Sequence, residues 1–407
     1  MKDKQVAFYG LPENVEFCQK CVMSNQKPNS TPEFKHQLTN KKSTMELVDG
    51  ICSACRIAEK KDQIDWEQRE KELIILLDKH RSKDGSYDCI VPGSGGKDSA
   101  YQAHVLKYKY GMNPLTVTWP PIMYTSYGYE NFKDWLDIGG FDNLSYNRNG
   151  KVLKLLTKLS IENLLHPFQT FILGQMNMAP RIAANLGIKL IFYGENPTEY
   201  GNAVAEDSTS LKDKSYFTMK NLDEIYLGGV SFKELKEKYD LKVNDILPYL
   251  PPTPEILTKT DIQVNYLGYY LKWTPQEVYY YAVENTGFKA RPFRSQGTYS
   301  KYNSIDDKID DLHYYTTFIK FGLGRTSYDA SQEIRNKHLT REEGLSLVRK
   351  YDGEFPDRYF NEIMNFLEMK PEKFHEICDR FRSPHLWNKV NGEWKLRHTI
   401  NLNGTDD

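Results

Sequence analysis

Short apolar runs alternate with stretches of helical periodicity through the middle of the chain. Residues 63–81 repeat apolar side chains at helical spacing, and Tyr87–Val91 is a short apolar run typical of a buried strand. The same patterns predict helices at about 97–110, 130–136, 151–165 and 175–186, and strands at 115–119, 144–146, 188–193 and 263–269. Because strands separated by helices favour parallel pairing, we predict an α/β fold with a parallel, doubly wound sheet.

The two ends of the chain have a different character. Residues 1–62 are rich in loops, and the pattern from about residue 300 onward is mainly helical, with a capping box at residues 340–343 (Thr-Arg-Glu-Glu). Residues 205–218 are polar, which indicates a loop, and residues 248–254 contain four prolines, which indicates extended chain or turns. We therefore predict an N-terminal module (1–62), an α/β domain (63–290) and a mainly helical C-terminal region (291–407).

Composition and charge narrow the class of protein. The 407 residues carry a formal net charge of −1, so no basic field covers the chain and nucleic acid is a disfavoured partner. No apolar run approaches the ~20 residues that span a bilayer. The first ten residues lack the apolar core of a signal peptide. We expect a cytoplasmic protein with no membrane partner.

Residues 90–100, Ile-Val-Pro-Gly-Ser-Gly-Gly-Lys-Asp-Ser-Ala, are the most informative stretch. Small residues after an apolar run let the backbone approach an anion closely, and the helix that opens at Lys97 directs its N–H groups toward the same point. The spacing fits neither Walker A nor the dinucleotide-binding Gly-x-Gly-x-x-Gly motif. It resembles the Ser-Gly-Gly-x-Asp-Ser signature of the PP-loop (N-type ATP pyrophosphatase) superfamily, whose members adenylate a carbonyl or amide oxygen and release pyrophosphate.

This resemblance implies roles for the residues of the motif. The β- and γ-phosphates of ATP would be held by Ser94, Gly95, Gly96 and Ser99. Lys97 would neutralise charge as pyrophosphate leaves, and Asp98 would orient the loop or serve a Mg²⁺ ion. The end of the next predicted strand, from Val117 to Trp119, would flank the adenosine.

A second motif, Gly194-Glu195-Asn196 followed by Glu199, comes after another predicted strand. The carboxyl ends of parallel strands are where such sheets bind ligands, so we expect it beside the loop, with Gly194 near the nucleotide. Glu195 and Glu199 would hold Mg²⁺ or act as acid or base, and Asn196 would bond the carbonyl that is activated. A polar loop that merely ends the strand is the alternative.

Four of the six cysteines form two close pairs. Cys18-x-x-Cys21 and Cys52-x-x-Cys55 have the spacing of a tetrahedral Zn²⁺ site, and a segment with few apolar residues needs such a cross-link. We predict a structural zinc ion, with an iron–sulfur cluster or redox thiols as alternatives. Neither remaining cysteine offers a reactive thiol beside the loop, since Cys89 lies within the preceding strand and Cys378 lies far along the chain.

Later strings of sequence indicate one family within this superfamily. Beside the cysteine pairs, the loop and Gly-Glu-Asn stand Ser295-Gln296-Gly297, Asp306-Asp307-Lys308-Ile309-Asp310, the segment 319–325 and Ile334-Arg335. Over nearly the full chain, this set resembles the N-acetyl sugar amidotransferase family. The resemblance implies an ATP-dependent enzyme that converts an N-acetyl group of a bacterial nucleotide-linked sugar, a diacetamido uronic acid or a nonulosonic acid, into an acetamidino group.

The resemblance also implies a chemistry and a partner. Adenylation of the amide oxygen would make AMP the leaving group, and ammonia would then attack the carbon to give the amidine. A glutaminase–cyclase pair resembling histidine-pathway proteins would supply the ammonia, since this chain shows no glutaminase triad. The product would enter a surface polysaccharide, such as an LPS O-antigen, or a flagellin glycan that contains pseudaminic or legionaminic acid.

Basic residues in the last third are candidates to bind the anionic sugar nucleotide. They are Arg291, Arg294, Lys301, Lys320 and Arg325. Arginine forks suit phosphate and carboxylate oxygens, but a solvated basic face is an equal alternative for each residue. On the sugar-binding hypothesis, Arg325→Ala raises KM for the sugar far more than for ATP.

Two other functions stay open from the sequence. A PP-loop enzyme that thiolates or amidates tRNA could also carry a zinc module, although the near-neutral charge and the lack of a cysteine beside the loop count against it. A non-enzymatic zinc adaptor would have no need of Lys97, Asp98 and both loop serines.

Overall fold

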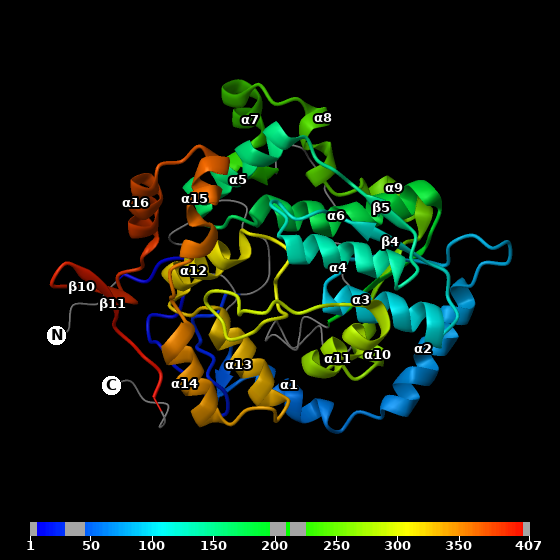
Figure 1. Cartoon of the computed structure of the whole chain (residues 1–407), viewed down its shortest axis with the longest axis horizontal. Helices are drawn as coiled ribbons and strands as arrows, with labels where there is room; N and C mark the ends of the chain where they lie inside the picture. Colours follow the sequence, from blue (N-terminus) through cyan, green and yellow to red (C-terminus); the bar gives the residue numbers. More distant parts are fainter. Residues whose placement is uncertain (1–5, 29–44, 196–208, 212–224, 402–407) are drawn as a thin grey trace.

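A five-stranded parallel sheet forms the centre of the computed structural model, which describes residues 6–28, 45–195, 209–211 and 225–401 (Figure 1). Its strands are β3 (Cys89–Pro92), β4 (Pro114–Thr118), β5 (Asn143–Ser145), β6 (Leu190–Tyr193) and β9 (Gln263–Tyr266). They lie in the order β5-β4-β3-β6-β9, and every neighbouring pair is parallel. The chain proceeds outward from β3 to one side and then returns to the other. The switch point, where open α/β sheets bind ligands, therefore lies between β3 and β6.

Helices dominate the rest of the described residues. They are α1 (Ser53–Lys61), α2 (Trp66–His80), α3 (Lys97–His104), α4 (Ser126–Asp137), α5 (Gly150–Leu164), α6 (Gln169–Leu186), α7 (Phe232–Tyr239), α8 (Val243–Ile246), α9 (Pro254–Thr260), α10 (Leu267–Tyr270), α11 (Pro275–Thr286), α12 (Asp310–Phe321), α13 (Arg325–Arg335), α14 (Arg341–Tyr351), α15 (Asp357–Leu367) and α16 (Pro371–Phe381). Three antiparallel pairs complete the structure: β1 (Leu47–Val48) with β2 (Ile51–Cys52), β7 (Tyr226–Leu227) with β8 (Val230–Ser231), and β10 (Trp387–Val390) with β11 (Glu393–Leu396). Within the described residues, no helix is both long and apolar enough to cross a bilayer.

Alternate strand residues enter two separate hydrophobic clusters. Cys89 and Val91 of β3 pack with residues of α2, α3 and α11, whereas Ile90 between them packs with residues of α5 and α6 on the other face. Successive side chains of a strand point to opposite faces, so this division means that helices cover both faces of the sheet. The predicted parallel, doubly wound fold is thereby confirmed.

Several element boundaries differ from those that the patterns predict. The helix expected to run from 97 to 110 is α-helical only to His104 and continues as a π-helical turn, Val105–Lys109. Helix α4 begins at Ser126, because the hydroxyl of Thr125 accepts a hydrogen bond from the N–H of Gly128. Helices α7 to α9 and the β10–β11 hairpin had no distinct signal in the hydrophobic pattern. α9 begins at Pro254, the last proline of the proline-rich stretch. Proline is suited to the first turn of a helix, because backbone N–H groups there have no intrahelical acceptor.

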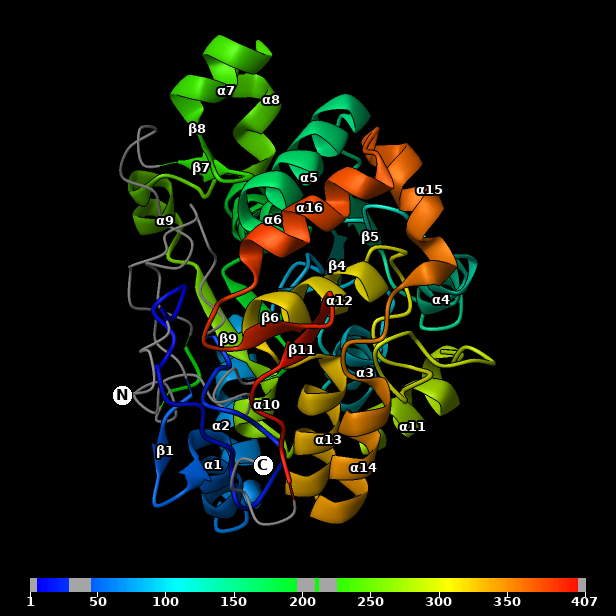
Figure 2. The ribbon, with the colours of Figure 1, turned by 90° about the vertical axis from the view of Figure 1, so that its left-hand side faces the viewer.

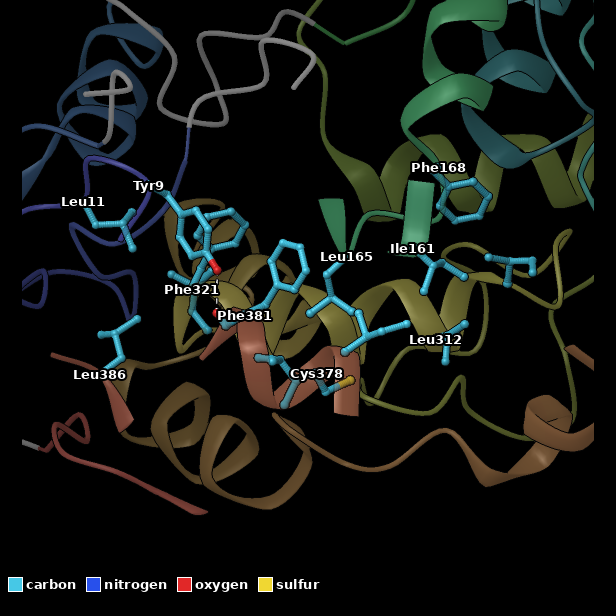
Figure 3. Packing of buried hydrophobic residues seen from close by; sticks show 14 of the residues in the cluster. Tyr9, Leu11, Ile161, Leu165, Phe168, Leu312, Phe321, Cys378, Phe381 and Leu386 are labelled. Carbon is cyan, nitrogen blue, oxygen red and sulfur yellow. Dashed lines mark hydrogen bonds between the residues drawn. The ribbon is translucent and has the colours of Figure 1, made fainter. Parts of the chain in front are cut away.

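One hydrophobic cluster joins the two ends of the chain (Figure 3). Tyr9 and Leu11 pack there against residues of α12 and α16, together with Leu165 from the end of α5. The Tyr9 hydroxyl donates a hydrogen bond to the carbonyl of Phe381 at 2.6 Å. The segment boundaries 1–62, 63–290 and 291–407 stay a prediction, but the first and last of these segments share a core.

A backbone seam joins the loop after β4 to residues 305–308. The N–H of Thr125 donates to the carbonyl of Asp306, and the N–H of Lys308 donates to the carbonyl of Met123. The carboxylate of Asp307 accepts hydrogen bonds from the N–H groups of Ile122 and Met123. A Cβ added to Gly128 would lie 2.3 Å from the Cα of Asp306, so only glycine permits this approach. The seam places the C-terminal segment across the carboxyl edge of the sheet.

Candidate active site

The loop between β3 and α3 depends on glycine at two positions. Gly95 has a φ of +83°, and a Cβ there would lie 2.6 Å from the Cα of Phe132 in α4. A Cβ at Gly93 would lie 2.2 Å from the Cβ of Ser99. Gly96 caps the N-terminus of α3. The backbone is thus packed tightly from behind, and its N–H groups lie at the positive end of a helix, as an anion site requires.

The first of two cavities at this edge of the sheet, here the loop cavity, has a volume of about 350 Å³. The loop and the second motif contribute one side of it: Ser94, Gly95, Gly96, Lys97, Asp98 and Glu195. The rest of the lining, here the facing wall, comes mainly from the C-terminal third. Its residues are Phe288, Tyr302, Asn303, Ser304, Ile305, Asp306, Arg325, Tyr328, Asp329 and Gln332, with Gly128 and Asn131 of α4. Figure 2 shows α13, which contributes to this cavity, side by side with α14 and below α12.

The second cavity, here the aromatic cavity, has a volume of about 430 Å³. Its walls include Pro92 and Gly93 at the end of β3, and Val117 and Trp119 from the end of β4. Helix α6 and the residue before it supply an apolar side: Phe168, Phe171, Ile172 and Met178, with Gln175. Asp307, Asp310 and His313, at and before the start of α12, add polar groups. A flat aromatic ring with a polar edge matches such walls.

Four residues line both cavities and mark their junction: Ser94, Ser304, Asp306 and Arg325. The hydroxyl of Ser94 donates to the Asp306 carboxylate at 2.7 Å. Nε of Arg325 donates to Oδ1 of Asp329 at 2.7 Å, and its guanidinium lies 5.3 Å from the centre of the Tyr314 ring. Ser304 has a φ of +46°, an uncommon conformation for a non-glycine residue and one that clusters at functional sites.

Burial favours the neutral form of three titratable groups that line the aromatic cavity, Asp307, Asp310 and His313. It raises the pKa of Asp307 to about 7 and raises the pKa of Asp310 well above its usual range. The pKa of His313 is lowered by burial and then by the neighbouring His166, on which its ring stacks at 4.9 Å. Oδ2 of Asp310 is buried and has no hydrogen-bond partner among the described residues. These three groups therefore add polarity to the cavity with less charge than exposed groups of the same type would carry.

The structure brings most of the predicted nucleotide residues to the two cavities. Lys97 is only 5% exposed, and its Nζ is paired with the Asp98 carboxylate at 2.6 Å. Ser99 does not line either cavity, because its hydroxyl donates to the carbonyl of Gly96. The carbonyl of Gly194 accepts from the N–H of Gly268, away from both linings. Asn196 and Glu199 lie outside the described residues.

Of the five basic residues predicted to bind the sugar, the structure brings only Arg325 to a cavity. Arg291 is 2% exposed and donates to the carbonyl of Ile305. Arg294 forms a bidentate ion pair with Glu354. Lys320 is buried and donates to the carbonyl of Leu164, and Lys301 is exposed on the surface. Although the five residues belong to one part of the sequence, their side chains have different partners and do not converge on one site.

Several lining residues carry no sequence signal of their own. Tyr302, Asn303, Asp329 and Gln332 belong to no recognised nucleotide motif, yet they face the phosphate loop. The acidic string 306–310 is the signal from which Asp306 could have been found. Met178 lies in a stretch whose pattern predicts only packing, yet it lines the aromatic cavity.

The two cysteine pairs converge on one point. The Sγ atoms of Cys18, Cys21, Cys52 and Cys55 all lie within 4.8 Å of one another, and all four residues are buried. Sγ of Cys18 is 3.9 Å from that of Cys55, and Sγ of Cys21 is 3.6 Å from that of Cys52. A Zn–S bond of about 2.3 Å in a tetrahedron requires sulfur atoms about 3.8 Å apart, so the thiols fit that ion.

Contacts around the cysteines join them to the C-terminal region. The N–H groups of Lys20 and Cys52 donate to Sγ of Cys18, as thiolates in such knuckles require. Arg341, the first residue of α14, donates to the carbonyls of Cys21 and Cys18 at 3.2 and 3.4 Å. Cys89 and Cys378 are buried elsewhere, and no cysteine is among the described residues that line either cavity.

The sheet order and the glycine-rich loop at its switch point define an α/β protein of the PP-loop type. Residues 296–401 match the family model described as "LPS biosynthesis protein WbpG-like, C-terminal domain", which bears out the family resemblance seen in the sequence. The chain thus carries a segment similar to the C-terminal domain of LPS biosynthesis proteins. The matched segment includes Tyr302, Asp306, Arg325 and Asp329 of the cavity linings.

Two of the solved structures that match the chain do so at low sequence identity, and no curated protein matches it. One is the NH3-dependent NAD synthetase from Campylobacter jejuni, with 14% identity over 55% of this chain and 94% of that chain and a TM-score of 0.28. Another is the NMN synthetase from Francisella tularensis, with 13% identity over 61% of this chain and 93% of that chain and a TM-score of 0.25. With TM-scores this low, the sheet order and the loop alone define the fold.

Proposed function

We propose that this protein is an ATP-dependent amidotransferase that converts an N-acetyl group of a bacterial nucleotide-linked sugar into an acetamidino group. One observation carries the proposal: the PP-loop and the WbpG-like segment line the same cavity. The loop has the chemistry to hold phosphates, and the segment similar to LPS biosynthesis proteins supplies the facing wall. The substrate would be a diacetamido uronic acid or a nonulosonic acid of a surface glycan.

ATP would extend from the aromatic cavity into the loop cavity. The adenosine would lie against Val117 and Trp119, where the aromatic cavity offers a flat apolar wall. The β- and γ-phosphates would meet the backbone of Ser94, Gly95 and Gly96 in the loop cavity. Each half of the nucleotide would thus lie against the groups that match its chemistry.

Charged groups of the loop cavity would handle the pyrophosphate. Lys97 would exchange part of its pairing with Asp98 for phosphate oxygens and so neutralise the leaving group. Asp98 and Glu195 line the cavity with carboxylate oxygens, the ligands that Mg²⁺ prefers, and a bound Mg²⁺ would neutralise further phosphate charge.

The reaction would proceed in two steps. The amide oxygen would attack the α-phosphorus, and the bond to pyrophosphate would break with its electron pair on the leaving group. Ammonia would then attack the imidate carbon and lose one proton, for which Glu195 is the candidate acceptor in the loop cavity. AMP would leave with the former amide oxygen. We propose that a glutaminase–cyclase pair supplies the ammonia in the cytoplasm.

The four cysteines would hold a structural Zn²⁺ ion. The donor set and the sulfur spacing fit zinc, and the cluster lies apart from the linings of both cavities. Bound zinc would supply a cross-link between the two cysteine knuckles. The hydrogen bonds of Arg341 would then fix the position of α14 relative to the knuckles.

A substrate panel tests the proposal. Purified protein would be incubated with Mg²⁺, ATP and ammonium chloride at alkaline pH, with UDP-diacetamido sugars, CMP-nonulosonic acids and bulk tRNA as separate acceptors. We expect stoichiometric AMP and pyrophosphate with one sugar, whose product is lighter by the difference between oxygen and NH. AMP release that depends only on tRNA would refute the sugar hypothesis and favour a tRNA-modifying enzyme.

A further inference from the structure

We propose that Arg325 binds the α-phosphate of ATP, at the bond that breaks during adenylation, and is therefore a catalytic residue rather than part of the sugar site. This inference rests on the proposed function for the direction in which ATP lies. It changes the role that sequence position suggested for Arg325, and it makes a different prediction about which ligand loses affinity when the side chain is removed.

The position of Arg325 follows from how the two cavities meet. A nucleotide with its base in the aromatic cavity and its terminal phosphates in the loop cavity must cross the junction. The part that crosses is the ribose and the α-phosphate, because these lie between base and pyrophosphate. The junction is lined by Ser94, Ser304, Asp306 and Arg325, and Arg325 is the one cation among these four described residues.

Packing fixes the guanidinium at this point. Arg325 is the first residue of α13, and its Nε–H donates to Asp329 one turn later. Oδ2 of Asp329 accepts a hydrogen bond from the Thr298 hydroxyl at 2.6 Å, which holds the carboxylate in turn. The ring of Tyr314 lies against the guanidinium from α12. A side chain held by a carboxylate of its own helix and by an aromatic ring of α12 is preorganised, as a group that stabilises a transition state must be.

The charges around the junction strengthen the requirement for this cation. Asp306 and Asp329 both line the loop cavity, and Asp306 is at the junction itself. Without Arg325, a phosphate crossing the junction would meet the Asp306 carboxylate, with Asp329 in the adjoining loop cavity. The hydroxyls of Ser94 and Ser304 would be the remaining side-chain groups at the junction, and that of Ser94 already donates to Asp306. As the α-phosphorus is attacked, negative charge grows on the bridging oxygen and on the equatorial oxygens, where an arginine fork is most effective.

The matching experiment compares ligands that do and do not contain the phosphate chain. Binding of α,β-methylene-ATP with Mg²⁺, of adenosine and of inorganic pyrophosphate would be measured by calorimetry for the wild type, Arg325→Ala and Arg325→Lys. We expect Arg325→Ala to weaken the ATP analogue by about 10- to 100-fold, with adenosine within about twofold of the wild type. Arg325→Lys should recover part of the loss, because lysine keeps the charge without the fork. Pyrophosphate should weaken less than the analogue.

The matched control is Arg349→Ala, which removes an exposed arginine of the next helix, α14, that lines neither cavity. Unchanged binding of the analogue by Arg325→Ala would overturn the proposal and would favour a role for Arg325 in binding the sugar. If the alanine variant does not fold, Arg325→Lys carries the same comparison, and an affinity equal to that of the wild type for every ligand would contradict the need for a fork. A wild type that binds none of these ligands would refute the proposed function itself, which is a separate result.

Discussion

The two sides of the loop cavity are built in contrasting ways. One side is a contiguous stretch, residues 94–98, that the sheet presents directly after β3. The other side comes from residues 302–306 and 325–332, more than two hundred positions later, and from α4. A phosphate-binding loop is a local structure whose chemistry follows from residue type and spacing. The facing wall has chemistry only where long-range packing places it.

The supports of the two sides differ as well. The loop is anchored by the central sheet and by α4, which Gly95 contacts closely. The facing wall is anchored by the N-terminal module: Arg341 donates to the carbonyls of two cysteines, and Lys27 lies 5.7 Å from the ring of Tyr328, a lining residue. Substitutions in the loop should therefore weaken phosphate binding, whereas substitutions in the N-terminal segment should first alter the position of the facing wall.

Loss of the metal site is expected to have the largest effect. Cys52→Ser should remove the bound zinc and lower the free energy of unfolding by about 3–5 kcal/mol, because metal binding and folding of such a module are coupled. Metal analysis and denaturant unfolding would measure both. Lys20→Ala, an exposed position within the first knuckle, serves as control and should keep the metal. Wild-type protein that contains no metal and is as stable as Cys52→Ser would contradict the zinc assignment.

Gly95→Ala tests the loop side alone. The new Cβ would meet the backbone of Phe132 at a φ that alanine rarely adopts, so we expect about 2–4 kcal/mol of destabilisation and loss of ATP binding. Gly85→Ala is a matched control, since Gly85 has a φ of +84° and no atom within 4 Å of where the alanine Cβ would lie. It should cost only about 1 kcal/mol. Equal effects of the two changes in thermal unfolding would mean that backbone strain alone, and not close packing, keeps glycine in the loop.

Gly128→Ala tests the seam between the two sides. A Cβ there would push Asp306 away from α4, so we expect about 1–3 kcal/mol of destabilisation, with weaker binding of an ATP analogue. Gly150→Ala, also in the first turn of a helix but with no atom near the added Cβ, should be neutral or slightly stabilising. Calorimetry would measure the affinity for the analogue, and chemical unfolding would measure the free energy of unfolding. Unaltered nucleotide binding in Gly128→Ala would show that the junction does not need the seam.

The smallest expected effect is a pH dependence of the contact between the ends of the chain. His385 is 4% exposed. Its Nδ1 is hydrogen-bonded to the Ser383 hydroxyl, and its Nε2 is hydrogen-bonded to Oε1 of Gln26. Burial, and then the nearby His398, lower the pKa of His385 to about 4. The unfolded chain, with a histidine pKa of about 6.5, binds the proton first. Stability should therefore fall as pH drops from about 6.5 to 4, by roughly 1 kcal/mol for each pH unit.

His385→Gln would sharpen this test. Glutamine can bond both neighbours without titrating, so its unfolding free energy should depend less on pH over the same window. Urea unfolding at pH 7, 5.5 and 4 would compare the two proteins. An identical slope in both would assign the pH dependence to other groups.

The contrast between the two sides also explains what the sequence could predict. The parallel sheet, the loop and the cysteine cluster each follow from local patterns, and the structure confirms the first and places the others where their chemistry requires. The five basic residues do not work as a set, because Arg291 and Lys320 are buried with carbonyl partners and only Arg325 reaches a cavity. The role of Asp306 depends on the seam at Thr125 and Gly128, which no spacing of residues reveals.

The core shared by Tyr9 and Phe381 has a consequence for biosynthesis. The two residues are 372 positions apart, so at 5–20 residues per second a ribosome needs roughly 20 to 70 s to synthesise the partner of Tyr9. During that interval the cysteine knuckles can capture a metal ion, but the residues of α16 that complete this hydrophobic cluster have not yet been made. The phosphate loop and its sheet can form while translation continues. A nascent chain would thus possess a nucleotide-binding surface well before it possesses the wall that closes the cavity.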